Sequence, residues 1–597
     1  MLMINMNDNE KMKWSLKELY SSFDGEDFKN DMRLLDQCIE KFISWTENSL
    51  KDNAESTKKL ESYISLIQEY VGLEGRLSSF ASLSFSADAK NEEAKRYLGI
   101  IEKKQTKITG AQVKFAKWIS SLEDLDKIIE ASNLLKEHEF YLKEIVLENK
   151  HILSEKEEIA ISKMRLTSSS AWLKLKNQLT SNHKVEVEID GKKQKLAITK
   201  VKNLLFSDNK EIRRKAFYAE LESNDSIAEG VAASLNGIKG EVLTICELKG
   251  YESPLKMTLE NSRMDEETLN VMLKVMKESL IDFKKYFFKK AELLGYQGKL
   301  PYYDIMAPVG KKDMFFSYDE AEKFIIKHFS SFSEDMGNLA KKAFDNRWID
   351  AEVRDGKRSG AFCHNLHFIK ESRVLCSFDG NFKNVCTIAH ELGHAYHGFV
   401  LQKESILNSS YPMPLAETAS IFAENIVRNA ALETANKDEA LVILGAELVN
   451  CASVIVDIYA RFLFEDEVFK RRKDGELSLE ELKDLMLWAQ KEAYGEAILE
   501  ETFDSYAWVH KPHYYYVGRN YYNFPYAFGL LFSKGLYKLY MEEGSAFVNK
   551  YNEVLRLTGQ ANIYDVARYI GIDLHDESFW RGSIDMVKRD IEKFCNI

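Results

Sequence analysis

Two histidines four residues apart, with a glutamate directly after the first, give the chain its clearest chemical signal, His390-Glu391-Leu392-Gly393-His394. Apolar residues around this motif recur at three- and four-residue steps, which predicts a helix beginning near Phe382. Residues i and i+4 share one face of a helix, so both imidazoles can reach one metal ion while Glu391 projects beside them. Nitrogen and oxygen ligands suit zinc. We therefore expect one Zn²⁺ per chain, with Glu391 as the general base that takes a proton from water.

A third ligand must come from a later part of the chain. The acidic candidates downstream are Glu404, Glu417 and Glu424. Glu417 and Glu424 follow Pro412-Met413-Pro414 in a segment expected to be one helix, and seven residues apart they lie on the same face. We expect Glu417 to be the ligand and Glu424 to hydrogen bond to a ligand histidine.

His397 is the alternative third ligand, because it completes a His-x-x-x-His-x-x-His pattern on the first helix. Three ligands from one unbroken helix would span two turns, about 10 Å of rise. Zn–N bonds of about 2 Å do not bridge that distance comfortably. If His397 is not a ligand, we expect it to contact a ligand residue or to face the substrate. The alternative for the whole motif is a surface helix whose histidines pair with glutamates.

A second group of candidate residues lies in Trp508–Phe528, which holds six tyrosines and two histidines. Phenol O–H and imidazole N–H groups can stabilise an oxyanion that develops beside a metal. Aromatic packing is the alternative interpretation. His364 and His367 are expected to be ordinary polar or core histidines. The glycines of Gly356–Ala361 suit a backbone that approaches a ligand closely.

The elements that must position these residues are mostly helices. Only 7 prolines and 29 glycines occur in 597 residues, which excludes collagen-like and low-complexity chains and makes a sandwich of many short strands unfavourable. Residues 185–198 alternate in type around Asp190-Gly191, which predicts a β-hairpin. Short apolar stretches within residues 301–378 predict a small sheet that leads into the metal-binding helix. We expect a helical lobe over residues 1–200 and a catalytic domain over residues 201–597.

Composition also limits the partners and the compartment. Lys and Arg number 82 against 94 Asp and Glu, for a net charge of −12, and no basic stripe emerges, so nucleic acid is not an expected partner. No run of 18 apolar residues predicts a membrane span, and the polar N-terminus carries no apolar signal region. The 7 scattered cysteines suit reduced thiols in a cytoplasm. The oligomeric state stays open.

Several segments together resemble the thimet oligopeptidase and oligoendopeptidase F family of zinc metallopeptidases, most of all its bacterial oligoendopeptidase F branch. The segments that carry the resemblance are Trp14–Tyr20, Leu300–Pro308, Gly356–Phe362, His390–His397, Ala416–Ser420 and Tyr521–Gly529. The His-Glu-x-x-His motif alone occurs in many families. Its combination with Ala-Glu-Thr-Ala-Ser and the tyrosine-rich segment is specific.

This resemblance implies a mainly α, zincin-like, two-lobed fold that encloses a deep substrate channel, with a small β-sheet near the active site. It implies cleavage of short oligopeptides and supports His390, His394 and Glu417 as ligands and Glu391 as the acid/base. The C-terminal residues that it implies act on the intermediate are His513, Tyr516, Tyr522 and Tyr526, with His510 and Tyr515 behind them. Phe524 stands where relatives have tyrosine. Gly356, Gly360 and Ala361 would belong to an edge strand that pairs with the peptide.

The resulting hypothesis is a cytoplasmic zinc endopeptidase that hydrolyses short oligopeptides without a covalent intermediate. One alternative is a helical peptide-binding or scaffold protein with a structural or vestigial metal site. A poised general base at Glu391 argues against it. The other alternative is a zinc hydrolase of non-peptide amides, which the Gly356–Ala361 segment disfavours.

Overall fold

The computed structural model describes residues 10–189, 191–310 and 314–597. Long helices dominate it, as the scarcity of helix breakers predicts. The first nine residues, which bear on the absence of a signal region, lie outside the described residues, and so does Asp190 of the predicted hairpin turn.

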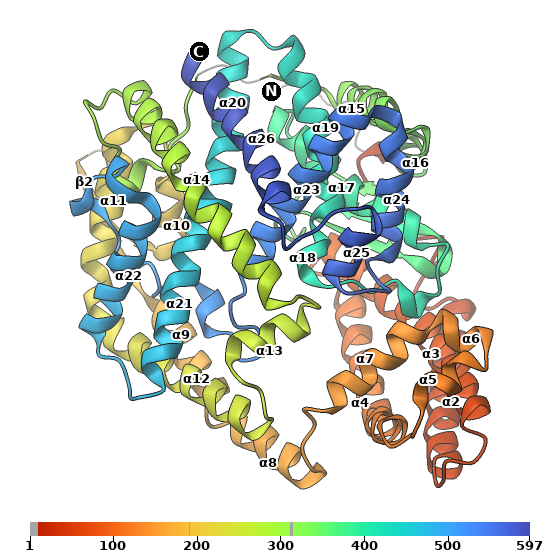
Figure 1. Cartoon of the computed structure of the whole chain (residues 1–597). Helices are drawn as coiled ribbons and strands as arrows, with labels where there is room; N and C mark the ends of the chain where they lie inside the picture. The colour runs from red at the N-terminus through yellow and green to blue at the C-terminus, as the bar shows by residue number, and fades with distance from the viewer. Residues whose placement is uncertain (1–9, 190, 311–313) are drawn as a thin grey trace.

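The N-terminal lobe is built on three long helices, α2 (Glu26–Ser49), α3 (Ser56–Ala87) and α4 (Glu92–Ser120). Their apolar faces enclose a core of their own, which extends through α7 (Glu139–Asn149). Figure 1 shows these helices in red and orange, set apart as one body of the molecule. The short helices α5 and α6 cover Leu125–Glu130 and Asn133–Glu137.

A β-hairpin follows, as predicted. Strands β1 (Lys184–Ile189) and β2 (Lys192–Ala197) pair antiparallel, and Gly191 in the turn has a φ of 74°, which glycine adopts without strain. After the hairpin, the Asn209 side chain accepts hydrogen bonds from the first turn of α11 (Lys210–Ser223) and so caps this helix. Helices α8 (Glu155–Arg165) and α9 (Ser169–Asn182) precede the hairpin in sequence, and α10 (Ile198–Leu204) follows it.

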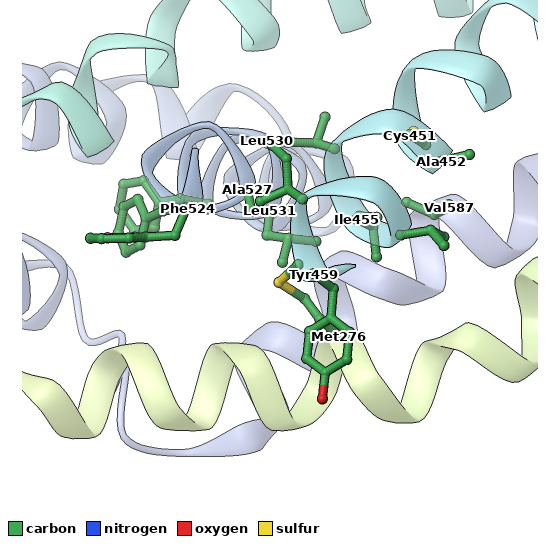
Figure 2. Packing of buried hydrophobic residues seen from close by; sticks show 14 of the residues in the cluster. Met276, Cys451, Ala452, Ile455, Tyr459, Phe524, Ala527, Leu530, Leu531 and Val587 are labelled. Atoms are coloured by element: carbon green, nitrogen blue, oxygen red, sulfur yellow. The ribbon is translucent and has the colours of Figure 1, made fainter. Parts of the chain in front are cut away.

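The second and larger core joins helices from residue 227 to the C-terminus. In Figure 2, residues of α23 (Phe524–Glu543) pack toward the consecutive segments α20 (Lys437–Ala452), η5 (Ser453–Asp457) and α21 (Ile458–Arg472). By length and composition alone, Lys437–Arg472 could cross a membrane, but 56% of its most apolar window is buried in the protein, and core helices pass the same criterion.

The remaining helices of this body surround that centre (Figure 1). The long ones are α12 (Ala228–Leu248), α14 (Glu266–Leu293), α15 (Tyr318–Phe332), α17 (Phe382–Leu401), α19 (Thr418–Thr434), α22 (Leu479–Tyr494) and α26 (Glu577–Asn596). The shorter ones are α13 (Pro254–Asn261), α16 (Glu334–Asp345), α18 (Met413–Ala416), α24 (Phe547–Leu557) and α25 (Ile563–Tyr569).

A small sheet leads into α17, as expected. Its strand order is β3 (Ile349–Asp350), β5 (Glu371–Leu375), β4 (Phe362–Leu366), so β4 is an edge strand. The prediction that Gly356–Ala361 forms the edge strand is wrong, because the strand begins at Phe362. Gly356 and Gly360 have φ values of 83° and 91°, which place them in turns rather than in a strand.

The predicted mainly α, two-lobed fold with a small sheet is thus confirmed. The two large cores provide the two lobes, and the sheet precedes the metal-motif helix directly in sequence. The division of the chain near residue 200 stays a prediction.

Candidate active site

Helix α17 carries the two histidines and the glutamate of the motif. It begins after Asn381, whose side chain accepts a hydrogen bond from the backbone N–H of Asn384. His390 and His394 lie one turn apart with ring centroids separated by 5.1 Å. The opposite side of the helix, including Val385 and Leu392, is buried in the larger core, so the helix has one fixed orientation.

A close helix crossing brings the third acidic group to the histidines. A Cβ atom at Gly393 would lie only 2.5 Å from the carbonyl oxygen of Ala419, so glycine is what lets α17 and α19 approach. Oε2 of Glu417 then lies 3.2 Å from Nε2 of His390 and 3.6 Å from Nε2 of His394. The potential ligand atoms of these three residues all lie within 4.8 Å of one another.

The helix predicted after Pro414 is not continuous. Helix α18 ends at Ala416 and α19 begins at Thr418, with Glu417 as the residue between them at φ −86° and ψ 1°. The Glu417 carbonyl accepts the first hydrogen bond of α19, from Ile421. Glu417, at this interruption, is the residue of the segment whose carboxylate reaches both histidines of α17.

Glu424 lies behind the histidines, seven residues further along α19. Its Oε2 is 3.3 Å from Nδ1 of His390, on the far side of the ring from Glu417. Burial alone lowers the pKa of His390, but the hydrogen bonds and charges of Glu417 and Glu424 outweigh it and raise the pKa to about 10. Burial acts to raise the pKa of Glu417, but His390 holds it at about 2.

Glu391 differs from the other carboxylates of the site in being buried without a cationic side chain bonded to it. Its Oε2 atom has no hydrogen-bond partner among the described residues. Burial raises the pKa of Glu391 to about 7, although the charge of His390 acts in the opposite direction. A buried carboxylate with a pKa near neutrality can both accept and return a proton.

The tyrosine-rich segment lies next to this group of carboxylates and imidazoles. A Cβ atom at Gly529 would be 2.8 Å from Cβ of Glu417, so α23 packs directly on the acidic residue. One turn earlier, Tyr526 donates a hydrogen bond to the Tyr522 hydroxyl at 3.3 Å. Burial and the neighbouring Tyr522 raise the pKa of Tyr526, and the charge of Glu417 adds to the shift, so its hydroxyl stays protonated.

His513 and Tyr516 lie against Tyr522 and, with Tyr526, form an aromatic wall of four residues beside Glu417. The ring centroids of His513 and Tyr522 are 4.7 Å apart, and those of Tyr516 and Tyr522 are 5.3 Å apart. The structure thus brings the four C-terminal residues named from the sequence into one cluster. Their roles in a reaction stay predictions.

Comparisons with known proteins place the chain in a family. The model for peptidase family M3 matches residues 203–586, and an oligopeptidase F model matches residues 121–184. The chain belongs to peptidase family M3. It is a metallopeptidase by family, and the resemblance inferred from the sequence is confirmed.

Among its M3 relatives, oligopeptidase PepF of Bacillus subtilis is 24% identical over 94% of this chain and 83% of its own length. An oligoendopeptidase F homologue of Lactococcus lactis is 24% identical over 99% of this chain and 98% of its own. A Chlamydophila abortus structure described as a peptidase matches with a TM-score of 0.84 and 21% identity over 98% of both chains. Oligoendopeptidase F from Enterococcus faecium gives a TM-score of 0.68 and 18% identity, over 95% of this chain and 98% of its own. These structures share the fold.

The structure of this M3 chain does not bring His397 into the ligand group. Its ring is fully buried and stacks on Tyr411 with centroids 4.1 Å apart. Its Nε2 atom lies 2.9 Å from the Thr558 hydroxyl. The ring therefore fills the core behind α17 and faces no substrate. Glu404 also lies outside the ligand group, and its carboxylate accepts a hydrogen bond from Gln560.

The other named histidines and aromatics serve in packing. His510 bonds to Asn224, and Tyr515 donates to the carbonyl of Trp508. His364 bonds to Ser79 of the N-terminal lobe, while His367 bonds to the carbonyl of Glu404. These positions agree with the expectation of ordinary polar or core histidines. Phe524 is buried, and Figure 2 shows it at the start of α23 among core residues.

The glycine segment contacts the N-terminal lobe. The Gly356 carbonyl accepts a hydrogen bond from the backbone N–H of Ala89 at 2.7 Å, and Arg358 donates one to Ser86. The segment therefore ties the end of α3 to the edge of the sheet. Gly360 and Ala361 stand immediately before the edge strand β4.

Two polar networks around the site were not found from the sequence. Arg428 lies 3.5 Å from Glu424 and also pairs with Glu447, which Lys534 contacts at 2.7 Å. Near His513, Asn523 bonds both the imidazole and Arg461. Arg428 stands four residues after Glu424, the spacing of a helical ion pair, and that was the one available sequence signal.

Proposed function

We propose that this chain is a zinc metalloendopeptidase that hydrolyses short oligopeptides in the cytoplasm. The observation that carries the proposal is the convergence of His390, His394 and Glu417, with the buried Glu391 beside them. The partners we propose are oligopeptides, without nucleic acid or membrane, and the oligomeric state is left open.

The residues present fit a zinc ion. Two imidazole nitrogens and one carboxylate oxygen are the donor set that catalytic zinc sites use, and Glu391 supplies an unpartnered buried oxygen next to them. His390, His394 and Glu417 would hold the ion, one per chain. Glu424 would orient His390 through its Nδ1 atom. When bound, zinc would polarise the scissile carbonyl and acidify water.

In the proposed reaction, Glu391 accepts a proton from the attacking water and passes it to the leaving amine. Burial raises the pKa of this carboxylate, which favours uptake of the proton from water. The hydroxyls of Tyr526 and Tyr522 would donate hydrogen bonds to the oxyanion, and Tyr516 and His513 would complete the wall that holds the peptide. No covalent intermediate is needed, because the nucleophile is water.

The proposal is tested by zinc stoichiometry and by cleavage of a quenched fluorescent peptide library, with the wild type and Glu391→Gln. We expect one zinc per chain in both proteins and cleavage only by the wild type. Peptide turnover that survives in Glu391→Gln would refute the general-base role. A zinc-loaded wild type that cleaves no peptide would refute the substrate class and favour a scaffold role or another amide substrate.

A further inference from the structure

His513 is held by an asparagine whose orientation is fixed by a neighbouring arginine. Asn523 Oδ1 lies 2.8 Å from Nδ1 of His513 and accepts a hydrogen bond from Nη1 of Arg461 at 3.1 Å. A guanidinium can only donate, so the amide oxygen of Asn523 must face Arg461. The same oxygen can only accept, so the proton in the bond to His513 belongs to Nδ1. In a neutral imidazole, Nε2 is then an acceptor.

Arg461 is itself held in place by an acidic residue. It donates to Asp457, which also accepts a hydrogen bond from the Tyr494 hydroxyl at 3.2 Å. Asp457 is the last residue of η5, a π-helical turn between α20 and α21. Such turns are rare, and they are frequent at functional sites. The orientation of Asn523 is therefore set by a partly buried ion pair rather than by a freely rotating group.

The local backbone turns Asn523 away from its usual role. It occupies the N-cap position of α23, where asparagine normally accepts a hydrogen bond from the first turn, yet its side chain makes no cap bond. Tyr521, two residues earlier, has a φ of 51°, a sparsely populated conformation for a residue other than glycine. Its hydroxyl is tied to Asp466 at 3.0 Å, which holds the strained turn in place.

The surroundings of His513 favour a neutral ring. Burial lowers its pKa, and although the hydrogen bond from its ring to Asn523 acts in the opposite direction, the charges of Arg461 and Lys511 lower the pKa further. The other titratable groups against the ring are the phenols of Tyr516 and Tyr522. Among the described residues, Asn523 is the one hydrogen-bond partner of the ring.

We propose that Asn523 and Arg461 are positioning residues that hold His513 as the neutral Nδ1–H tautomer, so that its Nε2 accepts a hydrogen bond from a backbone N–H of the bound peptide. This inference rests on the proposed function for the identity of the ligand. It changes the expected division of roles at the site. The tyrosines donate to the oxyanion, and His513 binds the peptide backbone as an acceptor.

The tautomer is tested without any substrate, by ¹⁵N NMR of the zinc-loaded protein labelled at its 12 histidines. His513→Gln identifies the His513 signals by their loss. We expect a protonated Nδ1 and an unprotonated Nε2 in the wild type and in Asn523→Asp, because a carboxylate also accepts from both neighbours. In Asn523→Leu we expect the Nε2–H form to gain population. A wild-type His513 with Nε2–H would overturn the proposal.

A matched control exists in the same loop. Asn520 is buried and its amide oxygen accepts a hydrogen bond from Lys239 at 3.2 Å, without contact to His513. Asn520→Leu therefore removes a comparable polar group from the loop and is expected to leave the His513 signals unchanged. A shift of the tautomer in Asn520→Leu equal to that in Asn523→Leu would show a general loosening of the loop and would overturn the specific role of Asn523.

The acceptor role is tested with a cleavable peptide in which one backbone nitrogen at a time is N-methylated. At the position that His513 contacts, methylation should lower kcat/KM of the wild type about tenfold, the effect of one ordinary hydrogen bond, and should not lower that of His513→Ala further. Asn523→Leu should behave like His513→Ala, and Asn523→Asp like the wild type. If methylation affects both enzymes equally at every position, the proposal is wrong. A protein that cleaves no peptide refutes the proposed function instead, and the NMR result then decides the tautomer alone.

Discussion

Burial gives Glu391 its proposed chemistry. The same carboxylate on an exposed helix face would keep an ordinary pKa and would be a weaker acceptor of a proton from water at neutral pH. In the structure, Oε2 of Glu391 is buried without a hydrogen-bond partner among the described residues, and burial raises the pKa of Glu391 to about 7. Burial acts to raise the pKa of Glu417, but its hydrogen bond with His390 holds that pKa at about 2. The pKa values of two carboxylates in one site are thereby shifted in opposite directions.

The choice between Glu417 and His397 as third ligand gives a direct prediction. Glu417→Ala should weaken zinc binding by more than about 100-fold, because it removes a proposed ligand. His397→Ala should bind zinc nearly as the wild type, but should unfold more easily because a buried, stacked ring is lost. Competition with a fluorescent chelator measures the first effect and thermal unfolding the second. The reverse order of zinc affinities would make His397 the ligand.

The network behind His390 gives a second prediction. In Arg428→Met, Glu424 loses its cationic neighbour while Glu447 keeps Lys534, so the core retains a paired charge. We expect zinc to dissociate about 10- to 100-fold faster, the range seen when groups that orient a ligand are removed. Stopped-flow release to a chelator measures the rate.

A buried arginine elsewhere provides the control. Arg213 is as buried as Arg428 and pairs with Asp304 at 2.7 Å, but it contacts none of the proposed ligands. Arg213→Met should destabilise the fold without changing the rate of zinc release. If Arg213→Met and Arg428→Met accelerate release equally, the effect is one of stability, and Arg428 does not act through Glu424.

At the scale of elements, the site depends on how closely two helices cross. The prediction concerns Gly393, whose missing side chain makes room for the backbone of α19. Gly393→Ala should force α17 and α19 apart, at a cost of about 1–3 kcal/mol in the free energy of unfolding. Because Glu417 stands at the start of α19, zinc affinity should fall as well. Urea unfolding and zinc competition measure the two effects.

Gly110 in α4 is the matched control for this substitution. It is also a helical glycine, but a Cβ atom there would meet no atom within 4 Å. Gly110→Ala should therefore stabilise the protein by about 0.5–1 kcal/mol, the helix propensity difference alone. If Gly393→Ala were also stabilising and kept its zinc affinity, the close crossing would not be needed for the site.

At the scale of the whole molecule, the two lobes with their separate cores must keep a fixed position relative to each other. Arg263 is one of the links. It donates to Glu144 of α7 in the N-terminal lobe at 2.7 Å, and to the carbonyls of Ser410 and Thr558 in the larger body. The Arg263 guanidinium also lies over the ring of Phe140, 4.9 Å from the ring centroid. One side chain thus joins α7, the approach to α18 and the end of α24.

This link predicts that Arg263→Met will uncouple the lobes. Loss of the partly buried ion pair should cost about 3 kcal/mol and let the N-terminal lobe unfold at a lower temperature than the larger body. Differential scanning calorimetry should then show a second, earlier transition. Lys41→Met, which removes an exposed pair with Glu69 within the N-terminal lobe, should leave the profile unchanged. A single unshifted transition in Arg263→Met would refute the coupling.

Much of this protein follows from local sequence alone. The His-Glu-x-x-His helix and the β-hairpin are short-range patterns that reflect the period of the helix or strand that they form, and the scarcity of helix breakers is a matter of composition. The Glu417–Glu424 spacing named two residues that do reach His390, although the helix expected to carry both is interrupted at Glu417. These patterns were sufficient to predict the mainly α fold and the residues that converge at α17. The resemblance to family M3 rested on motifs of the same short-range kind.

Only the tertiary structure decided which distant groups meet. His397 shares a helix with the proposed ligands, yet its ring packs on Tyr411 and bonds to Thr558, far away in sequence. Arg428 forms an ion pair with Glu447, and Asn523 accepts a hydrogen bond from Arg461, through contacts between separate helices. Burial, and with it the pKa of Glu391, is a property of the packed core. Local periodicity fixes which face a residue occupies, whereas what lies opposite that face depends on how the helices pack.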